Sequence, residues 1–312
     1  MKFGNYRFCC RFESDAHLPP YKGSTFRGVF GHALKDVVCA LKRAECTDCL
    51  LRERCVYARV FETALAVSLP EGSRVAAPPH PFVIEPPLID KTLFIKGDEF
   101  DFSLLLFGEA NDYLPYFIYA FERMGAIGIG RRINGRRGKF RLVSVDCNGQ
   151  PIYSDTTRKL QPPNHIAPLQ LRKPTGKPAP EQVQIELTTP LRFKFNKRLV
   201  SSLPFHILVR AMLRRISSLL VSYGDGDPPL DYSGLVKRAE SIRIAESSLH
   251  WHDWDRYSQR QKQKMQMGGL VGSIIYEGDL AEYVPLIEFC ERVHLGKQTA
   301  FGLGKIGIME EE

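Results

Sequence analysis

The sequence lacks any long apolar run. No segment approaches the roughly 18 consecutive apolar residues that a membrane-spanning helix requires. The first residues, MKFGNYRFCCRFESD, lack the apolar core of a secretion signal. Hydrophobic residues make up 44% and charged residues 25% of the chain, a globular composition that excludes a wholly disordered protein. We therefore expect a soluble protein of the cytoplasm.

The chain also lacks a large excess of charge of one sign. Its 43 Lys and Arg residues stand against 35 Asp and Glu residues, which gives a formal net charge of +8. This excess permits an anionic partner such as nucleic acid without requiring one. The positions of the cations are therefore more informative than their number. The length of 312 residues suits two domains, each with its own core.

Four of the eight cysteines lie close together: Cys39, Cys46, Cys49 and Cys55. Cys46-Thr-Asp-Cys49 has the spacing at which two thiolates bind one tetrahedral ion, and the other two cysteines complete a set of four. Clustered cysteines in a cytoplasmic protein favour metal over disulfides. The pattern predicts a structural zinc. Free thiols, a redox pair and an iron–sulfur cluster are the alternatives that the spacing leaves open.

The first half of the chain has the pattern of a ferredoxin-like domain. Alternating apolar residues over 6–12 predict a strand, and apolar residues three and four apart over 26–41 predict an amphipathic helix. Further on, the pattern predicts strands near 82–84 and 100–107, a helix over 113–124 and a strand over 140–145. The resulting order of strand, helix, strand, strand, helix, strand is ferredoxin-like.

The same order recurs after a segment with seven prolines, 151–180. Strand and helix patterns follow at 183–195, 205–223, 241–251, 269–276, 280–293 and 306–308. We therefore predict an α+β fold of two tandem ferredoxin-like (βαββαβ, RRM-like) domains, 1–150 and 181–312. Residues 151–180 would form a linker, and the cysteine cluster would be an insert (39–55) in the first domain.

Each half carries a glycine-rich loop before its last strand, at 125–139 and at 295–305. Neither loop is a Walker motif or a dinucleotide fingerprint. Glycines expose backbone N–H groups to phosphate, although a plain surface turn has the same composition. Six cations fall within residues 131–141, and this density suits a polyphosphate chain better than a single small anion.

These motifs carry a family resemblance. Leu295-Gly296, five further residues and Gly302-Leu303-Gly304 resemble the C-terminal glycine-rich motif of the repeat-associated (RAMP) superfamily of CRISPR proteins. The segments 22–28, 254–261 and 268–272 and the cysteine cluster, which ends in Cys55-Val-Tyr near Phe61-Glu62, extend the similarity over nearly the whole chain. Together they resemble the CRISPR precursor-RNA-processing endoribonuclease.

The resemblance implies cleavage of CRISPR repeat RNA without a metal cofactor. The ribose 2′-OH would attack the adjacent phosphate, leaving a 2′,3′-cyclic phosphate and a 5′-OH, a reaction that needs a base, an acid and cations. The implied partners are repeat RNA, mature guide RNA and, within an effector complex, other CRISPR subunits. A non-catalytic RNA-binding RAMP subunit of such a complex is the alternative function.

His32 is the candidate general base. It lies on the first predicted helix but off its apolar stripe, on a face with Gly28, Lys35 and Asp36. A histidine on this helix resembles the catalytic position of many family members. Lys35 would stabilise negative charge, and Tyr21, just before the helix, would assist. A solvated helix histidine is the alternative interpretation of His32.

The predicted RNA contacts are mostly arginines, since a guanidinium binds phosphate with two hydrogen bonds, and the glycine-loop backbone. Tyr257 would stack on a base, whereas solvated basic faces are the alternative for some of the cations. The predicted set is Lys22, Arg27, Arg131, Arg132, Arg136, Arg137, Lys139, Arg192, Arg210, Arg214, Arg256, Tyr257, Arg260, Gly296, Lys297, Gln298, Thr299, Gly302 and Gly304.

Overall fold

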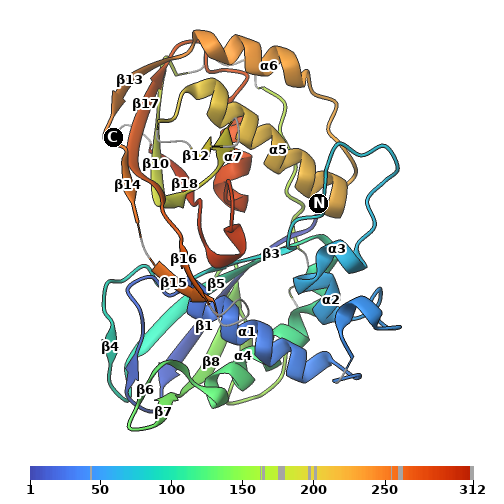
Figure 1. Cartoon of the computed structure of the whole chain (residues 1–312), viewed down its shortest axis with the longest axis vertical. Helices are drawn as coiled ribbons and strands as arrows, with labels where there is room; N and C mark the ends of the chain where they lie inside the picture. The colour runs from blue at the N-terminus through green and yellow to red at the C-terminus, as the bar shows by residue number, and fades with distance from the viewer. Residues whose placement is uncertain are drawn as a thin grey trace. The chain divides into compact units, whose positions relative to one another are not determined.

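A computed structural model describes the chain except for residues 43, 162, 164–165, 175–179, 196–197, 200–201, 254, 259–262 and 310–312. The chain forms two compact units (Figure 1). Unit 1 comprises Met1–Pro168 and Val221–Gly226, and unit 2 comprises Leu169–Leu220 and Asp227–Glu312. In the described part of the chain, no helix is long and apolar enough to cross a membrane.

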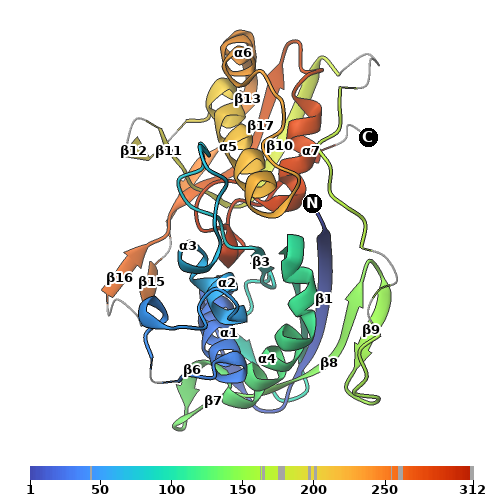
Figure 2. The same ribbon diagram turned by 90° about the vertical axis from the view of Figure 1, so that its right-hand side faces the viewer.

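Unit 1 is built on a five-stranded antiparallel sheet in the order β3-β5-β1-β8-β9. Helices α1 (Gly23–Val38) and α4 (Leu114–Ile127) pack side by side on one face of it (Figure 2). The strands are β1 (Phe3–Phe12), β3 (Phe82–Glu85), β5 (Glu99–Phe107), β8 (Phe140–Cys147) and β9 (Gln150–Ser154). The first four strands with the two helices give the ferredoxin-like order, as the sequence predicts.

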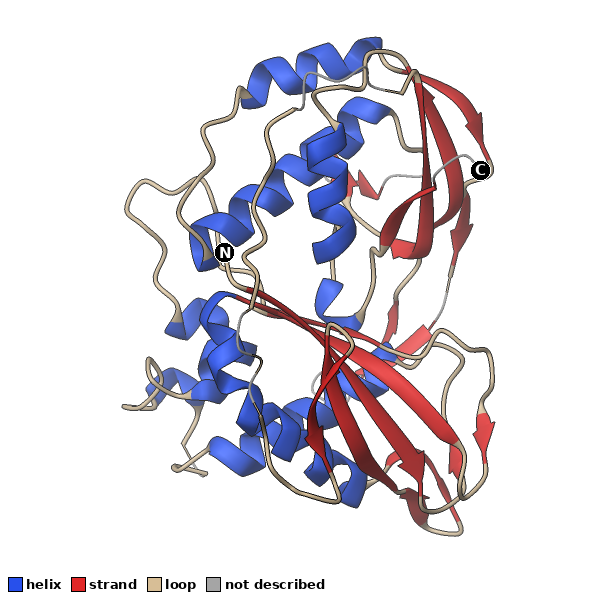
Figure 3. Ribbon diagram, turned by 180° about the vertical axis from the view of Figure 1, so that it is seen from behind, coloured by secondary structure: helices blue, strands red, loops and turns tan. Residues whose placement is uncertain are grey.

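The core of unit 1 is aromatic and lies between this sheet and its helices. Phe30 of α1 stacks on Phe121 of α4 with ring centroids 4.4 Å apart, and Phe8 of β1 lies 4.8 Å from Phe121. Along β1 the alternate residues face outward, where Arg7 donates to Asp101 at 2.7 Å. Figure 3 shows the strands from behind. This alternation is why β1 is recognisable from its sequence.

A smaller sheet in unit 1 has the order β4-β2-β6-β7. It consists of β2 (Ala16–His17), β4 (Leu93–Phe94), β6 (Ile129–Ile133) and β7 (Arg136–Gly138). Asn134 and Gly135, with φ of 48° and 79°, form the two-residue turn between β6 and β7. An Asn-Gly pair favours such a hairpin, because both residues tolerate positive φ. Most of the first glycine-rich stretch, expected to be a loop, is therefore a β-hairpin.

Short helices join α1 to β3 and β5 to α4. They are η1 (Cys46–Asp48), α2 (Val56–Phe61), α3 (Thr63–Ala66) and η2 (Gly108–Tyr113). Helix α2 packs against α1 at Gly31, where an added Cβ would lie 2.9 Å from Phe61 Cε1. The absence of a side chain at Gly31 thus lets the two helices approach each other.

The segment expected to be a linker begins inside this unit. Strand β9 pairs with β8, with Gln150 opposite Cys147, so the sheet continues beyond residue 150. Pro151 has no N–H group to donate, and it is tolerated because β9 is an edge strand.

Unit 2 repeats the ferredoxin-like order with the sheet β13-β17-β10-β18, and β14 also pairs with β17. Helices α5 (Phe205–Tyr223) and α7 (Val284–Val293) lie on one face of this sheet (Figure 1). The strands are β10 (Gln182–Leu191), β13 (Arg243–Ser247), β14 (His250–His252), β17 (Gly269–Glu277) and β18 (Ile306–Met309).

The remaining elements of unit 2 are short. Two ribbons pair β11 (Lys194–Phe195) with β12 (Arg198–Leu199) and β15 (Asp255–Ser258) with β16 (Gln263–Gln266). The short helices are α6 (Tyr232–Arg238), η3 (Ala239–Ser241) and η4 (Thr299–Phe301). The predicted tandem ferredoxin-like fold is thus confirmed.

Candidate nucleic-acid interface

His32 is exposed on α1, one turn before Lys35 and Asp36. Lys35 Nζ lies 5.5 Å from the centre of the Tyr57 ring. Arg123 Nη2 donates to Asp36 Oδ2 at 3.1 Å. Within the described residues, His32 itself has no hydrogen-bond or ion-pair partner. The structure therefore brings His32 and Lys35 together on one helix face and leaves the imidazole accessible to a ligand.

Tyr21 lies apart from this pair. It lies two residues before the first residue of α1, whereas His32 is in the middle of that helix. Burial, and then the charge of Glu85, raise the pKa of Tyr21 above its usual range. The hydroxyl therefore stays protonated near neutral pH. The predicted assistance of Tyr21 to His32 stays a prediction.

Two cations predicted to bind RNA instead anchor α1. Lys22 is fully buried, and its Nζ donates to the carbonyl oxygens of Pro20 at 2.8 Å and Ile89 at 2.5 Å. Burial lowers the pKa of this ammonium. Arg27 Nη2 donates to Nε2 of His80 at 3.0 Å, and its guanidinium lies 5.2 Å from the Phe61 ring centre. Lys22 thus lacks the exposed ammonium that an RNA contact needs.

The β6–β7 hairpin presents five exposed cations: Arg131, Arg132, Arg136, Arg137 and Lys139, which directly follows β7. None of the five has an acidic partner among the residues that the structure describes. Arg141, further along the same stretch, donates to Asp155 Oδ2 at 3.1 Å. The hairpin therefore carries the unneutralised positive charge of this stretch, as a surface for a phosphate chain requires.

The four clustered cysteines are half-buried free thiols. Within the described part of the chain, there is no group of three or more His, Cys, Asp or Glu side chains that could hold a metal ion. Burial raises the pKa of the Cys46 thiol, with Lys35 opposing and the nearby Glu62, Cys55 and Cys39 adding to the increase. The structural zinc stays a prediction.

The C-terminal glycine-rich loop is packed against the end of β10. Gly302 and Gly304 are buried with φ of 82° and 74°, and a Cβ on Gly304 would lie 1.7 Å from the Leu295 carbonyl oxygen. Lys297 N donates to Arg192 O at 2.7 Å. Both buried glycines therefore have a structural reason, whereas the Lys297 side chain is exposed. Gln298 and Thr299 are half-buried beside it, as is Gly296.

The other predicted contacts lie on several elements. Arg210 and Arg214 are exposed one turn apart on α5, and Arg192 is half-buried. Only the backbone of Arg256 and Tyr257, in β15, is described, and Arg260 lies outside the described residues. Arg215, beside Arg214, is buried and donates to backbone carbonyls at the end of α7.

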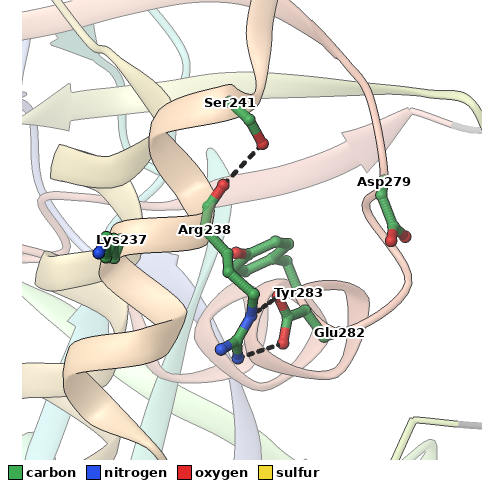
Figure 4. Close-up of a pocket in the computed structure, with 6 residues that line it drawn as sticks. All are labelled: Lys237, Arg238, Ser241, Asp279, Glu282 and Tyr283. Atoms are coloured by element: carbon green, nitrogen blue, oxygen red, sulfur yellow. Dashed lines mark hydrogen bonds and ion pairs between the residues drawn. The ribbon is translucent and has the colours of Figure 1, made fainter.

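A cavity of about 420 Å³ in unit 2 lies outside these predictions (Figure 4). Its lining residues are Lys237, Arg238, Ser241, Asp279, Glu282 and Tyr283. Arg238 donates from Nε and Nη2 to the two carboxylate oxygens of Glu282 at 2.8 and 2.7 Å, and from Nη1 to Asp231 at 3.1 Å. The two carboxylates already neutralise the Arg238 guanidinium. The residues that line the cavity therefore form a stabilising ion-pair cluster better than they form a binding site for an anion.

Comparison with known proteins agrees with this architecture. Residues 1–165 match the family model AF_1859_N, described as an N-terminal domain, and residues 185–306 match CRISPR-associated endoribonuclease Cas6. An uncharacterized protein of Archaeoglobus fulgidus is 26% identical over 292 residues, covering 92% of this chain and 91% of that protein.

Solved structures share the fold. A Cas6 product complex has a TM-score of 0.57 at 13% identity and covers 99% of both chains. A Thermus thermophilus Cas6 has a TM-score of 0.54 at 13% identity and covers 99% of this chain and 98% of its own. These likenesses show the tandem ferredoxin-like fold. The chain belongs to the family of the AF_1859_N N-terminal domain, and residues 185–306 are similar to CRISPR-associated endoribonuclease Cas6.

Proposed function

We propose that this protein cuts precursor CRISPR RNA within its repeats without using a metal ion. The proposal rests on His32, which is exposed on α1 and has no partner among the described residues. The same unit contains the basic β6–β7 hairpin. The hairpin binds the phosphate chain, and His32 supplies the base that cleavage needs.

In the proposed reaction, His32 accepts the proton of a ribose 2′-OH, and the 2′-oxygen attacks the adjacent phosphorus. The bond from phosphorus to the 5′-oxygen breaks, which leaves a 2′,3′-cyclic phosphate and, after the 5′-oxygen takes up a proton, a 5′-OH. Lys35, one turn from His32, stabilises the negative charge that builds up on the phosphate. Its contact with the Tyr57 ring limits where its ammonium can lie.

The test is incubation of purified protein with repeat RNA in EDTA, followed by analysis of the product ends. We expect one cut per repeat with a cyclic phosphate at the 3′ end. His32→Ala should slow cleavage by about tenfold or more with RNA binding kept, as expected for loss of a general base. His250→Ala is the control, because His250 is an exposed histidine in unit 2.

Two outcomes would contradict the proposal. If the wild-type protein binds repeat RNA but leaves it intact, the protein acts as a non-catalytic RNA-binding RAMP subunit. If His32→Ala cleaves as fast as the wild type, the general base lies elsewhere in the chain.

A further inference from the structure

Gly28 is an interior residue of α1 with no evident role in the fold. It lies one turn before His32, on the same helix face. Its φ is not positive, and a Cβ built on it would have nothing within 4 Å in the described part of the chain. Glycine is the poorest helix former after proline, so the residue weakens α1 without a gain in packing.

Gly31, three residues further on, is the informative contrast. A Cβ at Gly31 would lie 2.9 Å from Phe61 Cε1, so the packing of α2 against α1 explains that glycine. No contact of this kind explains Gly28. Gly28 and Gly31 of α1 therefore differ: packing against α2 explains Gly31, whereas no contact within the described residues explains Gly28.

Beyond His32, the next two polar side chains of α1 are held by other elements. Lys35 reaches to the Tyr57 ring, and Asp36 is held by Arg123. What remains on this face is the exposed imidazole of His32 beside a position without a side chain. Such a gap lets the backbone of a ligand come closer to the helix than any other residue would permit.

We propose that Gly28 is a positioning residue for RNA cleavage. The sugar-phosphate backbone of the RNA lies over Gly28, and this close approach brings the ribose 2′-OH within reach of His32. A side chain at position 28 would lift the RNA away from the helix and separate the 2′-OH from its base. The inference rests on the proposed function of His32 and adds the surface that receives the RNA.

The experiment compares Gly28→Ala, Gly28→Leu and a control, Ala245→Leu, at an exposed position of β13 in unit 2. Each variant is measured for thermal unfolding, affinity for repeat RNA and single-turnover cleavage. Gly28→Ala should unfold a few degrees higher than the wild type, because alanine is the better helix former. Cleavage should be slower with alanine and at least tenfold slower with leucine, whereas Ala245→Leu should cleave normally.

A variant that is more stable and yet less active separates positioning from damage to the fold. If Gly28→Leu folds and cleaves like the wild type while His32→Ala does not cleave, the inference on Gly28 is overturned and the proposed function stands. If Gly28→Leu unfolds at a lower temperature than the wild type, Gly28→Ala decides the inference: slower cleavage by this variant supports it, and cleavage at the wild-type rate overturns it. If the wild type binds RNA without cutting it, the proposed function fails. The role of Gly28 in cleavage then fails too, and affinity decides only whether the RNA backbone lies over Gly28: weaker binding by Gly28→Leu supports this placement, and unchanged binding overturns it.

Discussion

The guanidinium of Arg215 donates from Nε to the carbonyl oxygen of His294 at 3.0 Å. Its Nη2 also donates to the Val293 carbonyl at 2.7 Å, so a buried guanidinium caps the C-terminal end of α7. His294 is itself buried with φ of 57°, and its Nδ1 donates to the Leu303 carbonyl at 3.1 Å. Arg215 and His294 together fix both ends of the C-terminal glycine-rich loop.

We predict that Arg215→Met destabilises the protein by about 2–3 kcal/mol, because it leaves buried carbonyls without a charged donor. The neighbouring Arg214→Met is the control, since Arg214 is exposed and its replacement should change the free energy of unfolding by less than about 0.5 kcal/mol. Urea unfolding followed by circular dichroism measures both. Equal midpoints for the two variants would show that the cap does not stabilise α7.

The β6–β7 hairpin should determine how RNA binding depends on salt. Each cation that neutralises a phosphate contributes about 0.7–0.9 to the slope of log affinity against log salt concentration. The double variant Arg132→Ala/Arg137→Ala should therefore reduce this slope by about 1.5 and weaken binding of different RNA sequences to a similar extent. Fluorescence anisotropy with labelled RNA at several salt concentrations measures the slope.

Arg141→Ala is the matched control for the hairpin. Arg141 belongs to the same basic stretch but is already paired with Asp155 at 3.1 Å. Its loss should leave the salt slope almost unchanged. A slope that falls as much for Arg141→Ala as for one hairpin arginine would mean that net charge, rather than the hairpin surface, determines RNA binding.

Periodicity was sufficient to predict the tandem fold and the exposed face of α1 that bears His32, because both depend on local patterns in the sequence. Which individual Lys and Arg side chains are buried was harder to predict. Lys22 is buried because its ammonium reaches the carbonyl of Ile89, 67 residues away in the sequence. Arg215 did leave a signal, because it lies on the apolar stripe of α5 with Met212 and Leu219. The β6–β7 hairpin also had a signal in its Asn-Gly pair.

The zinc prediction is tested by elemental analysis of freshly purified protein. If the four cysteines hold a structural zinc, the protein should contain one equivalent, and Cys49→Ser should lose it. Cys290→Ser is the control, because Cys290 is a buried thiol in unit 2. Freshly purified protein that contains neither zinc nor iron would contradict the prediction. A full equivalent that Cys49→Ser abolishes would show that the metal gathers the cysteines, since metal binding and local folding are coupled.

The ion pair between Arg238 and Glu282 should make unit 2 sensitive to acid. Hydrogen bonds from Arg238 lower the pKa of Glu282, and a bond from the Gly234 N–H group, then Arg238, lowers the pKa of Asp231. A carboxyl whose pKa is lower in the folded state stabilises the fold above its unfolded pKa, about 4, and this contribution is lost as the pH falls through the folded value. The melting temperature should therefore change little from pH 7 to 5 and fall below pH 4.

Glu282→Gln should lower the free energy of unfolding at pH 7 by about 0.5–1 kcal/mol. It should also reduce the fall in melting temperature at acid pH, because the carboxylate that pairs with Arg238 is already gone. Glu246→Gln, at an exposed position of β13, should leave the curve unchanged. Parallel curves for wild type and Glu282→Gln would show that the pair contributes nothing to the pH dependence.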